Sequence, residues 1–171
     1  MATKTSASKA TSKATSKATK VKAIPDGYHS ITPYLVMDGA ARAIDFYKRA
    51  FDAKEVMRMP APNDRVGHAE LRIGDSVLML ADEHPEMDAR GPGHYGGSPV
   101  TLLLYVADVD KQFKQALDAG ATEVRPVADQ FYGDRSGTLK DPFGHSWHLS
   151  THKEDVSVEE MARRMAAMQK G

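Results

Sequence analysis

Cysteine is absent from the 171 residues of the chain. Without it, neither a disulfide framework nor a thiolate metal site can form. This composition is typical of a reducing compartment, so we expect a cytoplasmic protein. No apolar run approaches the ~20 residues that a membrane-spanning helix needs, and the N-terminus lacks the apolar segment of a secretory signal. These absences predict a soluble protein that makes no membrane contact.

Acidic residues are missing from the first 22 positions, which carry six lysines. The whole chain has a net charge of +0, so an acidic body follows this basic tail. The tetrapeptide Ser-Lys-Ala-Thr occurs three times in tandem between residues 8 and 19. Such a polar repeat cannot offset its ordering entropy, and we predict disorder over residues 1–24. The tail is either a solvated extension or an arm that makes weak contact with nucleic acid.

A first module, residues 28–82, reads as strand, helix and three further strands. Apolar residues recur at helical spacing between residues 40 and 51, and Asp38 is placed to act as the N-cap of this helix. Two alternating runs that flank Gly74 and Asp75 predict a hairpin.

A second module, residues 99–152, repeats that order after a Gly-, Pro- and His-rich stretch, residues 83–98, that reads as a loop. Asp108 is placed to cap its helix, and Gly120 stands where a left-handed C-cap belongs. We therefore predict an α+β fold of two tandem βαβββ modules. Their curved, mostly antiparallel sheets form a cleft, and their helices cover the outer face.

A last helix is predicted over residues 156–169, because Ser157 and Glu160 have the spacing of a capping box. Met161, Met165 and Met168 fall on one face of it. This face either docks on the protein's own body or forms a contact in a dimer.

Side-chain alternation predicts which strand residues face the cleft. If Ala69 and Leu71 pack under the helix, their neighbours on the same strand point to the other side. Expected cleft residues are His68, Glu70, Arg72, Met79, Thr101, Leu103, Tyr105 and His148, with Tyr34, Tyr132 and Arg135 at the rim. Trp147 alternates with His148 and should point to the core.

Two residues apart on one strand, His68 and Glu70 can reach one point in the cleft. We name them, with His148, as the candidate catalytic residues. Three interpretations stay open at this stage. The residues line a binding cup as a plain ion pair, they form an acid–base pair, or they make a displaced three-ligand metal site with His148.

Several stretches resemble a known family. The run Ala43-Ile44-Asp45-Phe46-Tyr47 and the later Ala119-Gly120-Ala121 are similar to the helix signatures of glyoxalase and bleomycin-resistance proteins of the vicinal oxygen chelate superfamily. The run from Gly133 to Trp147 is more specific and, with His68-Ala69-Glu70-Leu71, looks like the PhnB-like branch. The resemblance implies the paired-module fold and a homodimer. It leaves the reaction open, because the superfamily holds lyases, isomerases, dioxygenases and non-catalytic binders.

Catalytic members of that superfamily usually hold one divalent metal through four strand residues, two from each module. The resemblance places these positions at Ile31 or Thr32, Met79, Thr101 and His148. Only His148 is a competent ligand. We therefore expect a protein without the usual metal and without another cofactor. We expect it to bind a small organic molecule, with or without a metal-free reaction on that molecule. The alternatives are a metal-dependent lyase, isomerase or dioxygenase that uses His68, Glu70 and His148, and a nucleic-acid-associated protein that uses its tail.

Overall fold

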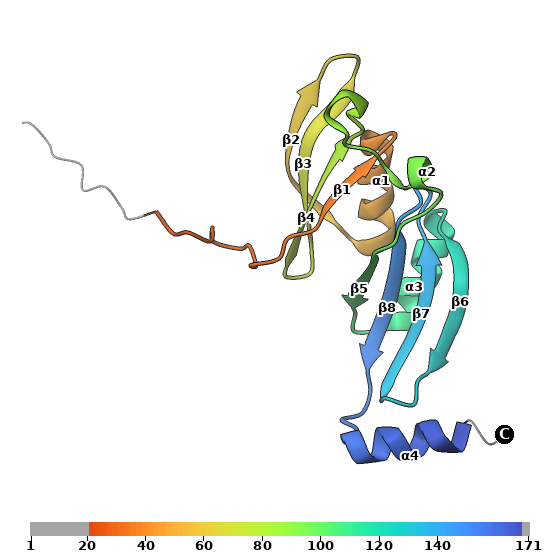
Figure 1. The fold of residues 1–171 in the computed structure, drawn as a ribbon. Helices are drawn as coiled ribbons and strands as arrows, with labels where there is room; N and C mark the ends of the chain where they lie inside the picture. The colour runs from red at the N-terminus through yellow and green to blue at the C-terminus, as the bar shows by residue number, and fades with distance from the viewer. Residues whose placement is uncertain (1–20, 169–171) are drawn as a thin grey trace, which may run out of the picture.

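The computed structural model of the protein describes residues 21–168. Most of the predicted basic tail and the last residue of the predicted final helix lie outside this part of the chain. The elements follow the predicted order, strand–helix–three strands, twice over (Figure 1). None of the helices in the described part is long and apolar enough to cross a membrane.

Module one folds into a four-stranded mixed sheet in the order β1-β4-β3-β2. Strands β1 and β4 are parallel, and the other neighbours are antiparallel. The chain passes through β1 (Tyr34–Met37), α1 (Ala40–Phe51), β2 (Lys54–Ala61), β3 (Arg65–Ile73) and β4 (Ser76–Asp82).

Module two repeats this topology in the order β5-β8-β7-β6, again with one parallel pair at the edge. It contains β5 (Thr101–Tyr105), α3 (Val109–Ala119), β6 (Thr122–Asp129), β7 (Asp134–Lys140) and β8 (Ser146–His152). The predicted α+β fold of two βαβββ modules is thus confirmed. In the described part of the chain, α1 packs on one face of the module-one sheet and α3 packs on one face of the module-two sheet. We call the opposite face of each sheet, which neither of these helices covers, its open face.

The connection between the modules is more ordered than the predicted loop. It contains a 3-10 helix η1 (Pro85–Met87) and a short helix α2 (Pro92–Tyr95). Both have a proline in their first turn, where its fixed φ suits a helix start and its missing N–H costs nothing. Gly96 ends α2 in the left-handed region, at φ 75°.

The start of α1 is capped from a distance and not by Asp38, so that prediction was wrong. The N-cap residue is Gly39, at φ 88°, and no side chain of its own segment caps the helix. Asp82, at the end of β4, instead accepts from the N–H groups of Gly39, Ala40 and Val66 at 2.8, 2.9 and 2.7 Å. The other two cap predictions are confirmed. Asp108 accepts from the Lys111 N–H at 3.1 Å, and Gly120 ends α3 at φ 115°.

The two modules join through their helices, since α1 packs against α3 as well as against its own sheet. Asp141, in the turn between β7 and β8, binds across the joint. It accepts from the Tyr47 hydroxyl of α1 at 2.6 Å and from Trp147 Nε1 at 3.0 Å. The rings of Phe51 and Trp147 lie 4.6 Å apart there, so Trp147 is a core residue, as predicted. This joint places both helices behind the sheets in Figure 1, and the two open faces lie side by side.

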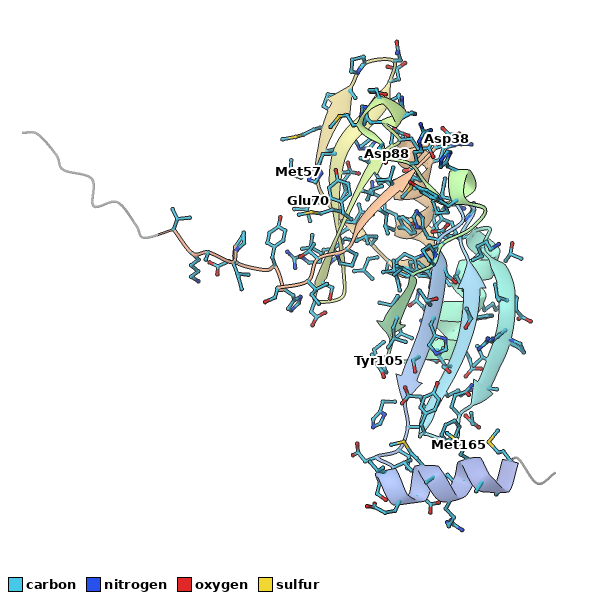
Figure 2. All side chains as sticks on the ribbon, viewed as in Figure 1. Asp38, Met57, Glu70, Asp88, Tyr105 and Met165 are labelled. Carbon is cyan, nitrogen blue, oxygen red and sulfur yellow. The ribbon has the colours of Figure 1, made fainter. Side chains whose placement is uncertain are left out.

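The final helix, α4 (Val158–Met168), begins with the predicted capping contact, from the Glu160 N–H to the Ser157 hydroxyl at 3.2 Å. Its Arg164 binds Glu154 at 2.8 Å and reaches the Phe131 carbonyl. The methionine face gains little cover from the rest of the described chain, because Met165 and Met168 remain exposed (Figure 2).

Candidate functional site

The open face of sheet one carries the residues that alternation predicted. Ala69 and Leu71 are fully buried under α1, so His68 and Glu70 point the other way. Strand register places Glu70 between Met57 on β2 and Met79 on β4, and Tyr34 on β1 lies beyond Met79. Figure 2 shows Met57 and Glu70 side by side on this sheet.

Four side chains on this face form a continuous hydrogen-bonded row. Tyr34 Oη lies 3.0 Å from His68 Nδ1, and His68 Nε2 lies 3.3 Å from Glu70 Oε1. The Tyr28 hydroxyl donates to the other oxygen of Glu70. We call Tyr34, His68, Glu70 and Tyr28 the sheet-one row. Glu70 is 7% exposed and Tyr34 is 49% exposed, so the row runs from a covered carboxylate to an accessible hydroxyl.

The row determines where the protons lie. A carboxylate oxygen beside His68 Nε2 favours the tautomer with its proton on Nε2, which leaves Nδ1 to accept from Tyr34. The hydrogen bond to Glu70 raises the pKa of Tyr28, and burial raises the pKa of Tyr34, so both phenols are protonated near neutral pH. Such a row can move a proton along its length, which is the chemistry of the predicted acid–base pair.

Tyr28 is the member of the row that the sequence did not reveal. It precedes the first strand, in a segment without alternation, and its partner is 42 positions away. Arg72, predicted to face the cleft, lies near this segment, with Nη1 3.5 Å from the Gly27 carbonyl.

The open face of sheet two has different chemistry at matching positions. His148 on β8 stands opposite Leu103 on β5 and Thr138 on β7. The corresponding positions in sheet one hold Met79 on β4, Tyr34 on β1 and Glu70 on β3. Thr138 Oγ1 lies 2.9 Å from His148 Nδ1. Burial, and then the charge of Arg125, lower the pKa of His148, so it is a neutral imidazole near neutral pH. Thr101 lies on the same face, at the exposed start of β5.

A second polar cluster on sheet two centres on Asp134, which sequence reasoning missed. Its carboxylate binds Ser150 Oγ at 2.8 Å, Tyr105 Oη at 3.1 Å and His152 Nδ1 at 2.7 Å. Burial alone would raise the pKa of Asp134, but these donors hold it below its ordinary value. Tyr132, expected at the rim, lies beside this cluster with Oη 3.4 Å from Ser136 Oγ. Asp134 lies on β7 and its partners lie on β5 and β8, so no local pattern indicates them.

Arg135 does not occupy the expected rim position. It alternates with Asp134 and Ser136 along β7 and therefore lies on the helix-covered face. There its guanidinium binds Asp110 of α3 through two hydrogen bonds of 2.8 and 2.7 Å, and it also contacts Asp129. These contacts leave Arg135 a structural role in holding α3 against the sheet.

The three candidate catalytic residues do not gather at one point within a single chain. His68 and Glu70 are in contact, whereas His148 bonds to Thr138 on the other sheet. Between residues 21 and 168, no three His, Asp or Glu side chains are grouped so that they could hold a metal ion. The positions that the resemblance assigned to a metal hold Ile31 or Thr32, Met79 and Thr101 beside His148, and isoleucine, threonine and methionine are poor ligands for a hard dication. This residue set does not fit the metal of the superfamily.

An apolar cavity of about 750 Å³ adjoins the sheet-one row at the joint between the modules. The ring of Tyr34 forms part of its wall, together with residues of the connection and of β5. Its polar lining includes Arg90 and His145, while most of the remainder is proline, glycine and aliphatic side chains. His145 is buried there, and this burial lowers its pKa.

Fold and faces together define a class, the α+β proteins built from two tandem βαβββ modules. This chain belongs to the Glyoxalase/Bleomycin resistance protein/Dioxygenase superfamily, whose sequence model matches residues 27–149. An uncharacterized protein of Mycobacterium tuberculosis (strain ATCC 25618 / H37Rv) is 45% identical over 145 residues, which are 83% of this chain and 85% of that protein.

Solved structures agree with this assignment. TioX from Micromonospora sp. ML1 is 28% identical, with a TM-score of 0.59 over 71% of this chain and 97% of TioX. A PhnB protein from Bacillus cereus has the same fold, with 19% identity and a TM-score of 0.55 over 72% of this chain and 99% of that one. The predicted superfamily is thus confirmed, and the PhnB protein shares the fold.

Proposed function

We propose that the protein binds a small organic molecule between the open face of module one and the open face of module two from a second copy. The observation that carries this proposal is the arrangement of the two faces. In one chain they lie side by side, and each exposes apolar side chains such as Met59, Leu103 and Tyr105. Exposed apolar patches on a soluble domain mark surfaces that contact a ligand or a partner.

The composition of the two faces indicates the kind of ligand. Methionines and tyrosines supply apolar and aromatic contact, while His68, Glu70, Arg72, Arg125 and His148 supply a few polar groups. Pockets for small organic molecules have this mixture of an apolar lining and few convergent polar groups. Of the positions that the resemblance assigned to a metal, only His148 is a competent ligand. The proposed binding therefore needs no metal. A cytoplasmic location remains a prediction.

Cross-linking tests the pairing, and the absence of cysteine makes each introduced thiol unique. Met59→Cys and Leu103→Cys chains are mixed and treated with a bismaleimide that spans about 10 Å, the spacing of two facing sheets. We expect a covalent two-chain product. The matched control is Met59→Cys mixed with Val158→Cys, a more exposed apolar position on α4, which should give no such product. If the double variant Met59→Cys/Leu103→Cys cross-links only within one chain, the two-chain cup is wrong.

Binding is tested with 8-anilinonaphthalene-1-sulfonate, an aromatic anion that fluoresces in apolar sites. We expect saturable binding that Leu103→Lys weakens about tenfold, or ~1.4 kcal/mol. Val158→Lys should leave it unchanged. Equal losses in both variants would contradict a site on the open faces.

A further inference from the structure

The geometry points to Tyr34, His68 and Glu70 as a nucleophile–base–orienting triad, in which the Tyr34 oxygen attacks an acyl or sulfonyl centre of a small molecule. This inference rests on the proposed function, because the attacked molecule is the one that lies against the open face. Neither the family membership nor any relative named above assigns this role to Tyr34.

The contacts have the order that such a triad requires. An activated nucleophile lies within hydrogen-bond reach of a base, and a third group orients the base. Here the Tyr34 oxygen is 3.0 Å from His68 Nδ1, and His68 Nε2 is 3.3 Å from Glu70 Oε1. Tyr28 binds the remaining oxygen of Glu70, which leaves Oε1 to face the imidazole.

Accessibility assigns the attack to the tyrosine. The side chain of His68 is 23% exposed and both of its ring nitrogens are already engaged. Tyr34 is half exposed, so a molecule that lies against the open face can approach its hydroxyl. His68 therefore accepts a proton from Tyr34, and Glu70 is a positioning residue that acts through His68.

The attack needs no reactant other than the triad and the bound molecule. As the Tyr34 oxygen forms its bond to the electrophilic atom, its proton passes to His68 Nδ1. The leaving group departs with the electron pair of the broken bond. The resulting imidazolium lies beside the carboxylate of Glu70, which stabilises the charge.

Two other exposed tyrosines serve as internal references. Tyr95 is 61% exposed on the connection and lines the same joint cavity as Tyr34, and no hydrogen bond of its hydroxyl is found in the described part. Tyr105 is 59% exposed and its hydroxyl donates to Asp134. Asp134 is a poor base because its donors lower its pKa. Exposure alone therefore predicts more modification at Tyr95 and Tyr105 than at Tyr34, and the triad predicts the reverse.

The test treats the full chain with 4-toluenesulfonyl fluoride and reads each tyrosine by peptide mass spectrometry. Attack forms the O–S bond, breaks the S–F bond and releases fluoride. We expect Tyr34 to be modified at least about a hundredfold faster than Tyr95, the lower range for general-base assistance. A rate at Tyr34 equal to or below that at Tyr95 would overturn the triad, and this comparison needs no variant.

Variants then separate the roles. His68→Ala should lower the rate at Tyr34 to that at Tyr95, and added imidazole, which fits the vacated space, should restore it. Glu70→Gln should lower the rate at Tyr34 less, and should add nothing in the His68→Ala background. The rate at Tyr105 monitors folding in every variant. Loss without rescue by imidazole would mean that His68 is only structural, and no loss would remove it from the reaction.

These results are distinct from the test of the two-chain cup. Selective modification of Tyr34 without intermolecular cross-linking would keep the triad and reject the cup. Cross-linking without selective modification would do the opposite.

Discussion

The two modules share one strand order, yet they differ in what they bury and in what they expose. Seven residues of α1 are buried but only three of α3, because α1 packs against its own sheet, against α3 and against the aromatic rings of Phe143 and Trp147 in module two. The start of α1 is held by the charged Asp82. At the matching place in module two, the neutral Thr151 hydroxyl accepts from the Val109 N–H at 2.9 Å.

The open faces differ in the same way. At the matching positions, module one places a covered carboxylate beside His68, whereas module two pairs His148 with a threonine; its buried carboxylate, Asp134, contacts His152 further along the strands. Duplication thus preserved the backbone topology while the side chains diverged. Module one supplies the central helix and the sheet-one row, and module two supplies a neutral imidazole and the exposed apolar Leu103 and Tyr105.

The largest expected effect breaks the joint between the modules. Asp141→Ala would leave the Tyr47 hydroxyl and Trp147 Nε1 buried without their acceptor, and it would also remove the acceptor of two backbone N–H groups. We expect a loss of ~3–5 kcal/mol in the free energy of unfolding, measured in urea by Trp147 fluorescence. The control is Asp118→Ala, whose carboxylate pairs with Lys114 at the surface, with a loss below ~0.5 kcal/mol. Equal losses would show that Asp141 does not hold the modules together.

A smaller effect compares the two helix caps. Asp82→Ala removes an acceptor from three backbone N–H groups, whereas Thr151→Ala removes one. We expect losses of ~2–3 kcal/mol and ~1 kcal/mol respectively, from the same denaturation experiment. If Thr151→Ala lowers the free energy of unfolding as much as Asp82→Ala does, the charge of the capping residue makes no difference.

The same pair should differ in pH dependence. Burial alone would raise the pKa of Asp82, but the N–H groups of Val66, Ala40 and Gly39 hold it below its ordinary value. A carboxyl with a lowered pKa in the folded state stabilises the fold above its unfolded pKa of about 4, and this stabilisation is lost as pH falls through the folded value. The difference between Asp82→Ala and the unsubstituted chain should therefore shrink below about pH 4, whereas that of Thr151→Ala should stay constant.

The most local of these effects concerns one packing position. Gly137 in β7 occupies the position that corresponds to Ala69 in β3. A Cβ added to it would lie 2.7 Å from Phe113 Cε2 of α3. Gly137→Ala should cost ~1–3 kcal/mol by overpacking. Adding Phe113→Leu should recover part of that loss in a double-mutant cycle, since the two residues share one space. Simple additivity of the two losses would contradict this packing argument.

Local patterns predicted much of the fold and the shared face of His68 and Glu70. Alternation along β3 and β8 correctly assigned Leu71 and Trp147 to the core, and helical spacing gave α1 and α3 with the caps Asp108 and Gly120. It failed where a partner is distant in sequence. Asp38 was an acceptable cap by local rules, but Asp82 reaches the same N–H groups from 42 positions away. Arg135 was misplaced because its partner Asp110 lies on another element.

The sequence by itself determined the two modules, the approximate extent of α1 and α3 and, Arg135 excepted, the face on which the strand residues named above lie. These features depend on neighbours two to four positions apart, which a periodic pattern records. Only the tertiary structure decided that Tyr28 joins Glu70, that Asp134 and Asp141 gather donors from several segments, and that His68 and His148 lie on separate sheets. Such contacts form when segments distant in the chain pack together, and no spacing within one segment encodes them.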